Sequence, residues 1–261
     1  MSDKDVLACT PKFVEISTES QSIEKKSGTQ KVFNLIILDE SGSMAMIAEQ
    51  AVSGLNETFQ TISNAQKEHQ EQQHFISFVT FNSSRIRTVL NRLPVDSNNR
   101  MEWNDFGPCN CTPLYDAMGQ SLNELKGHVG KDDVVLVTII TDGMENASRE
   151  YSGRDIKNLV SELRGKGWVF AYIGTNQDVD AVADDMGIRS RMHYDYSSEG
   201  ITCMYKAEMR SRSAFFDRLA REGKQFMMDE GFDYFSSNEQ DEEDEENSMG
   251  IWKWIKNHIK G

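Results

Sequence analysis

The sequence predicts an α/β fold: a doubly wound, mostly parallel six-stranded sheet with one antiparallel edge strand and helices on both faces. Two observations carry this prediction. Short, β-branched apolar runs alternate with segments whose apolar residues recur every three or four positions, which is typical of a parallel sheet covered by crossover helices. The link at residues 82–84 is too short for a crossover and indicates a hairpin.

Each element follows from its own pattern along the chain. The strands are expected at residues 31–39, 74–82, 85–90, 133–141, 167–174 and 192–196. Between them, apolar residues at helical spacing predict helices from Ile47 to Ile62, Leu114 to Leu125, Ile156 to Leu163 and Val179 to Met186, with a last helix over about 200–223. Each helix should bury one apolar stripe against the sheet.

The chain divides into four regions by composition. Residues 1–30 are a polar N-terminal extension, 31–223 form the α/β domain, and 224–248 are an acidic linker that we expect to be disordered. Residues 249–261 predict a short amphipathic helix, because their isoleucines and tryptophans fall on one face at about 100° per residue. A helix this short is marginal alone, so it should fold only against the acidic body, a partner groove or a membrane surface.

Charge and composition limit the classes of partner. The formal net charge is -14, and an acidic chain is poorly suited to bind the phosphates of a nucleic acid. No apolar run approaches the length of a membrane span, so we do not expect a membrane protein. Scattered cysteines and the lack of a visible secretory signal favour a reduced, cytoplasmic protein. The oligomeric state stays open.

Three separated fragments carry oxygen ligands. Asp39, Ser41 and Ser43 follow the first buried strand at alternate positions, Asp142 follows the fourth, and Thr112 precedes a predicted helix, where a hydroxyl suits the N-terminus. In open α/β sheets, ligands bind beyond the carboxyl ends of the strands. Carboxylates and hydroxyls that converge there suit a magnesium-like cation. An ion whose coordination is not completed by the protein attracts an external carboxylate. This is a mechanism of binding and not of catalysis.

In these residues the chain resembles a von Willebrand factor type A domain with an intact metal-ion-dependent adhesion site. The family pattern is DxSxS, a separate Thr and a separate Asp, matched here by the five residues named above across roughly residues 31–223. The resemblance implies a Rossmann-like sandwich, a Mg²⁺ or Mn²⁺ ion, and a protein partner whose Glu or Asp completes the coordination. The sequence segments around these residues are more similar to bacterial cytoplasmic members of the family than to extracellular ones; they read LDESGSM, TPLYDAM and IITDGMEN.

Two other functions compete with a metal-dependent binding module. One is an adaptor that binds through its C-terminal helix and uses the metal site for regulation. The other is a metal-dependent phosphohydrolase, which would need a second Asp as general acid two residues after the first. That position holds Ser41, which cannot do this work near neutral pH. The sequence therefore favours a protein that is not an enzyme.

Overall fold

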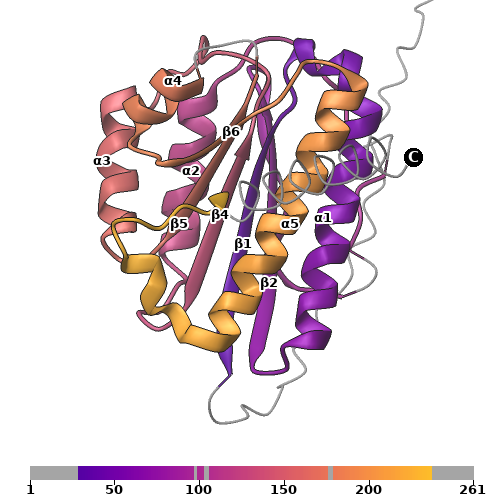
Figure 1. Ribbon diagram of the computed structural model, residues 1–261. Helices are drawn as coiled ribbons and strands as arrows, with labels where there is room; N and C mark the ends of the chain where they lie inside the picture. The colour runs from indigo at the N-terminus through magenta and orange to yellow at the C-terminus, as the bar shows by residue number, and fades with distance from the viewer. Residues whose placement is uncertain (1–28, 97–98, 103–105, 176–178, 237–261) are drawn as a thin grey trace, which may run out of the picture.

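A computed structural model describes residues 29–96, 99–102, 106–175 and 179–236 of the 261-residue chain. Its six-stranded sheet has the order β3-β2-β1-β4-β5-β6 (Figure 1). Every neighbouring pair is parallel except β2 with β3, which is antiparallel and lies at one edge. The predicted fold class is confirmed, including the hairpin at residues 82–84.

The elements lie close to the expected ranges. The strands are β1 (Gln30–Asp39), β2 (Gln72–Asn82), β3 (Arg85–Pro94), β4 (Val134–Ile140), β5 (Val169–Gly174) and β6 (Ser190–His193). The α-helices are α1 (Ala48–Glu68), α2 (Leu114–Lys126), α3 (Gly153–Arg164), α4 (Val179–Met186) and α5 (Ser198–Glu222). In the described ranges, the 3-10 helices η1 (Gly42–Ile47) and η3 (Gly223–Met228) join or extend them.

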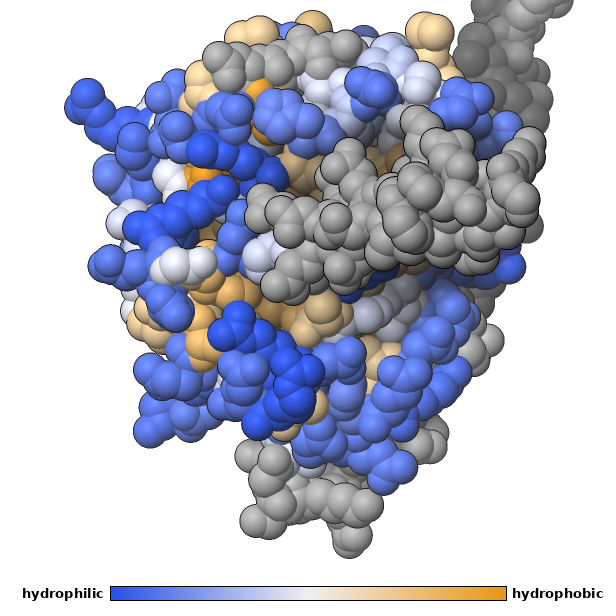
Figure 2. Space-filling view, viewed as in Figure 1, coloured by the Kyte–Doolittle hydropathy of each residue, from blue (hydrophilic) through white to orange (hydrophobic). Residues whose placement is uncertain are grey.

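Both faces of the sheet are buried, because alternate side chains of each central strand enter different cores. On β1, Ile36 belongs to the core that α1 and α5 cover, whereas Ile37 belongs to the core under α2, α3 and α4 (Figure 1). Helices α1 and α5 also pack closely, since a Cβ atom at Gly54 would lie 2.1 Å from the ring of Tyr205. Figure 2 shows the face that carries α5, where hydrophilic residues make up most of the coloured surface and apolar patches interrupt them.

The packed domain ends later than the sequence boundary at residue 223. Phe226, Tyr234 and Phe235 are buried in the core beside α5, and the main-chain N–H of Tyr234 donates to Ser190 Oγ at 2.9 Å. Residues 224–236 are therefore part of the folded unit and not of an acidic linker. The boundary was misplaced because the apolar residues of this stretch form two short clusters, at 226–228 and 232–235, that follow no helical or alternating period.

A buried ion pair ties this C-terminal segment to the sheet. The Arg212 guanidinium, which is fully buried, donates to Glu208 Oε1 at 2.5 and 2.9 Å. It also donates to Asn34 Oδ1 on β1 and to Thr138 Oγ1 on β4, while the Tyr234 hydroxyl donates to the same Glu208 oxygen at 3.0 Å. The Arg212–Glu208 pair thus joins two strands, α5 and the end of the domain.

Some expectations fall outside the described residues. The N-terminal extension up to residue 28 and the chain from 237 to 261, with the acidic run and the amphipathic helix, are not described. Within the described ranges, the search for a helix with the length and apolar character of a membrane span finds none.

We predict that Glu208→Gln strongly destabilises the protein, because it leaves the Arg212 charge buried without a counter-charge. Loss of one partner from a buried pair costs about 3–5 kcal/mol. The matched control is Glu222→Gln on the same helix, whose pair with Arg218 is exposed and 2.9 Å long and should be worth at most about 1 kcal/mol. Urea unfolding of both variants measures the difference, and equal losses would contradict this role of Arg212.

Candidate metal centre

The pairing of β1 with β4 sets the first half of the site. Leu38 lies opposite Ile140 in the parallel register, so the residues one step further, Asp39 and Thr141, come side by side at the carboxyl ends of the strands. The Thr141 hydroxyl donates to Asp39 Oδ2 at 2.6 Å, and the main-chain N–H of Ser41 donates to Asp39 Oδ1 at 2.7 Å. Asp39 is fully buried and held by both its oxygens.

A chain of hydroxyls links the first fragment to the last. The oxygens of Ser41 and Ser43 are 3.1 Å apart, and the Ser43 hydroxyl donates to Asp142 Oδ1 at 2.8 Å. The Tyr196 hydroxyl donates to the main-chain carbonyl of Ser43 and thereby supports the start of η1 from the β6–α5 side. Ser43 and Asp142, which are separated by 99 positions in the sequence, are therefore in direct contact.

Thr112 reaches the same place from a third loop. A Cβ atom at Gly143 would lie 3.3 Å from Thr112 Oγ1 and 3.9 Å from Ser43 Oγ, so both hydroxyls border the bare main chain that follows Asp142. The helix cap of α2 is Pro113, with no capping bond from a side chain. Thr112 lies just before the helix, as its place in the sequence indicated, but it does not cap α2, and its hydroxyl lies near Gly143.

The two carboxylates are in an environment that disfavours their charge. The pKa of Asp39 is raised to about 6, mainly by burial and to a lesser extent by the nearby Asp142, against the opposing effect of the hydrogen bonds from Thr141 and Ser41. Burial also raises the pKa of Asp142, against which the Ser43 hydroxyl at Oδ1 and the nearby Tyr196 hydroxyl act. Asp142 Oδ2 is buried and, among the described residues, has no hydrogen-bond partner. An unpaired buried carboxylate oxygen is costly, so a ligand at this oxygen would remove an existing penalty.

These residues fit a hard divalent cation. Mg²⁺ takes oxygen ligands and is usually held by one or two carboxylates. Asp39 and Asp142 supply the carboxylates, while Ser41, Ser43 and Thr112 supply neutral hydroxyls. In the described part of the chain, no group of three or more His, Cys, Asp or Glu side chains is arranged to hold a metal. The candidate set differs from such clusters because three of its five side chains are hydroxyls.

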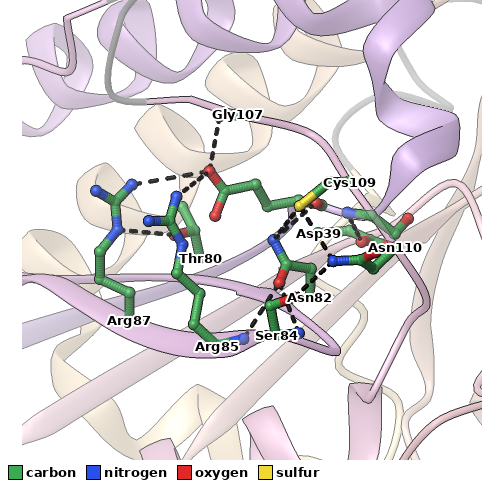
Figure 3. Close-up of polar contacts among 11 residues, drawn as sticks. Asp39, Thr80, Asn82, Ser84, Arg85, Arg87, Gly107, Cys109 and Asn110 are labelled. Atoms are coloured by element: carbon green, nitrogen blue, oxygen red, sulfur yellow. Dashed lines mark hydrogen bonds and ion pairs between the residues drawn. The ribbon is translucent and has the colours of Figure 1, made fainter. Parts of the chain in front are cut away.

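Glu40 is a residue of the site whose role the sequence analysis missed. Glu40 lies between Asp39 and Ser41 in the sequence, and its side chain is fully buried. Its Oε1 accepts from the main-chain N–H of Gly107 at 2.8 Å and from Arg85 at 3.0 Å. Arg87 Nη2 lies 3.8 Å from the same oxygen. Figure 3 shows both arginines reaching from β3 toward Gly107. The signal in the sequence was an acid at the end of an apolar strand and two arginines at the start of the hairpin strand.

The main chain around Glu40 anchors the loop that carries Thr112. The carbonyl of Glu40 accepts from the N–H of Cys109 at 3.1 Å and from Asn82 Nδ2 at 3.3 Å, and the N–H of Gly42 donates to the carbonyl of Asn110 at 3.0 Å. Asn110 also bonds Ser84 in the hairpin turn (Figure 3). The loop is thus fastened to β1 and to the β2–β3 turn just before Thr112.

Comparisons with known proteins bear on the fold alone. No family model and no curated protein sequence matches the chain. Among solved structures, the PilB minor pilin from Streptococcus sanguinis is similar with a TM-score of 0.54 at 10% identity, over 74% of this chain and 64% of the pilin. Proximal thread matrix protein 1 from the mussel byssus gives a TM-score of 0.53 at 13% identity, over 70% of this chain and 46% of that protein.

The pilus adhesin SpaC from Lactobacillus rhamnosus GG also gives a TM-score of 0.53 at 13% identity, over 74% of this chain and 32% of the adhesin. This chain therefore spans between about a third and two thirds of the length of these three proteins. The likeness supports the α/β sandwich that the family resemblance implied. The bound metal and the bacterial cytoplasmic type stay predictions.

We predict that Glu40→Gln loosens the loop before Thr112 without unfolding the domain. Glutamine retains an oxygen for Gly107 but loses the charge that faces Arg85 and Arg87, a loss of about 1–3 kcal/mol for a buried, charge-assisted hydrogen bond. Hydrogen exchange at the amides of Gly107 and Cys109 should accelerate by about tenfold or more. The control is Glu71→Gln, whose side chain is 55% exposed. Unchanged exchange in Glu40→Gln would show that the ion pair does not hold the loop.

Proposed function

We propose that the chain is a metal-dependent protein-binding module and not an enzyme. A Mg²⁺ or Mn²⁺ ion would be held by Asp39, Ser41, Ser43, Thr112 and Asp142, and a Glu or Asp of a protein partner would complete its coordination. The observation that carries this proposal is Asp142 Oδ2, a buried carboxylate oxygen with no partner in the described chain, beside hydroxyls from two other loops.

The balance of charge supports binding of an external carboxylate. The two aspartates can neutralise a dication, while the three hydroxyls add no charge, so the ion would keep its affinity for a further anion. The bound metal would supply electrostatic attraction for that anion. The chain's own residues would place the ion at the edge of the sheet, where Ser43 is exposed while Asp39 and Asp142 are buried.

The geometry gives no support to phosphohydrolase chemistry. A general acid is needed two residues after the strand-end aspartate, and that position holds the Ser41 hydroxyl, which faces Ser43. The adaptor function rests on residues 249–261, which lie outside the described chain. A cytoplasmic location remains part of the proposal and rests on the sequence pattern.

We predict that Asp142→Asn abolishes the stabilisation of the protein by Mg²⁺. At an ion concentration of about 100 times the dissociation constant, the wild type should gain about 2.7 kcal/mol, and the variant should gain nothing. Without metal the variant should be at least as stable as the wild type, because it removes a desolvated charge near Asp39. Thermal unfolding in Mg²⁺ and in EDTA measures both effects. If Asp142→Asn is less stable than the wild type in EDTA, where no metal is bound, the Asp142 side chain has a structural role.

The same variant tests the function. A tagged wild-type chain, incubated with lysate of its source cell, should retain partner proteins in Mg²⁺ that are lost in EDTA and in Asp142→Asn. A set of partners that is the same in all three conditions would contradict the metal-bridged mechanism. It would direct attention to residues 249–261.

Metal affinity should also depend on pH. The pKa of Asp39 in the metal-free protein is raised to about 6, so above this pH the carboxylate is free to bind, and below it the ion must displace a proton. The dissociation constant should be steady above about pH 7 and rise by up to tenfold per pH unit below about pH 6. Calorimetric titration with Mn²⁺ at several pH values tests this, and an affinity that is constant down to about pH 5 would exclude Asp39 as a ligand.

A further inference from the structure

A groove of about 570 Å³ lies next to the candidate metal centre. Cys111 and Pro113, the neighbours of Thr112 in the chain, line it, as does Asn146, which is bonded to the Thr112 main chain, so the groove begins beside the main chain of Thr112. Its walls are the β2–β3 turn at residues 82–86, the start of α2 and the loop at 146–150. A segment that places a carboxylate on the metal can therefore continue along this groove.

The acidic residues that line the groove are already engaged. Asp116 accepts from three main-chain N–H groups, those of Arg149, Glu150 and Tyr151, at 2.8–2.9 Å. The Glu150 carboxylate accepts from Gln120 Nε2 at 2.9 Å. Because these acceptors hold the loop against α2, the carboxylate of Asp116 serves the loop's own main chain and is not available to a ligand.

Hydrogen-bond donors, in contrast, remain available along the groove. Asn146 uses its Oδ1 to accept from the N–H of Thr112 at 2.9 Å and its own N–H to donate to the Thr112 carbonyl at 3.1 Å. Its side-chain NH₂ has no partner among the described residues. Arg149 is exposed and forms no ion pair within the described part of the chain. Arg85 uses one N–H for Glu40 and has further donors.

We propose that this groove binds an extended acidic segment of the protein partner, with a second carboxylate paired to Arg149. The inference rests on the proposed function and names the partner's chemistry: one Glu or Asp at the metal and another further along the same segment. Arg149 and Arg85 offset the carboxylates of Asp116 and Glu150 in this groove, within a chain of net charge -14, and Arg149 is left without an ion pair in the described part of the chain. Local complementarity of this kind fixes the register of a partner and rejects uncharged segments.

The probe is a set of fluorescent synthetic peptides of glycine and serine that contain either one glutamate or two glutamates at varied separations. Binding to the full-length protein is followed by fluorescence anisotropy in saturating Mg²⁺. The best peptide with two glutamates should bind at least about tenfold more tightly than the peptide with one, as expected for one charge-assisted hydrogen bond. Equal affinities, or no binding by any peptide, would overturn the proposal.

Variants of single residues identify the contact. Arg149→Gln should remove the tenfold advantage of the second glutamate and leave the binding of Mg²⁺ unchanged. The control is Arg154→Gln, an exposed arginine on α3 outside the groove, which should change neither. An unaltered preference for two glutamates in Arg149→Gln would overturn the assignment of the second subsite.

Two further arms test the contributions of the metal and of the chain's own acidic run. If the advantage of the second glutamate depends on Arg149 but persists in EDTA and in Asp142→Asn, the groove is supported and the metal function fails. A full-length variant with glutamine or asparagine at the acidic positions of 236–247 should bind the peptides as the wild type does. Tighter binding by that variant would make the acidic run the occupant and would overturn the assignment to a partner.

Discussion

The parallel pairing of β1 with β4 is the constraint on which the candidate site depends. Its register places Leu38 opposite Ile140, so two polar strand exits meet at one edge of the sheet. A slip of one residue would turn every side chain of a strand to the opposite face. Because both faces of these strands are packed against helices, the core that stabilises the fold also fixes the relative position of Asp39 and Thr141.

Buried charges have a second role, which is to fasten segments that the sheet does not pair. Arg212 joins β1, β4 and α5 on one face of the sheet. Glu40 joins the end of β1 to the hairpin and to the loop before Thr112. Neither group has a simple hydrophobic replacement, because each is bonded to several partners at once. Such ties are strong only while every member is present.

The sequence was most informative where a period or a motif was present. Buried strands and striped helices made the sheet and its edge hairpin predictable, and the spacing of Asp39, Ser41 and Ser43 marked one end of the site. The contact of Glu40 with Arg85 could not be predicted from the sequence. It joins residues 45 positions apart, and it depends on the conformation of a loop. The packed residues up to 236 were missed because Phe226 and Tyr234 belong to short apolar clusters that follow no period. The start of α2 at Leu114 was predicted, whereas the sequence did not show that Pro113, and not Thr112, occupies the cap position.

The attachment of Tyr234 has a consequence for competition between ligands. Its main chain is bonded to Ser190 and its hydroxyl to Glu208, so the chain leaves the described domain at residue 236 from a fixed point. The acidic run begins three residues later, at Glu239. A tethered segment has an effective concentration of about a millimolar at surfaces within its reach. Binding by this tethered run and binding by a free acidic segment can therefore be told apart by dilution, because only the binding of the free segment weakens as the protein is diluted.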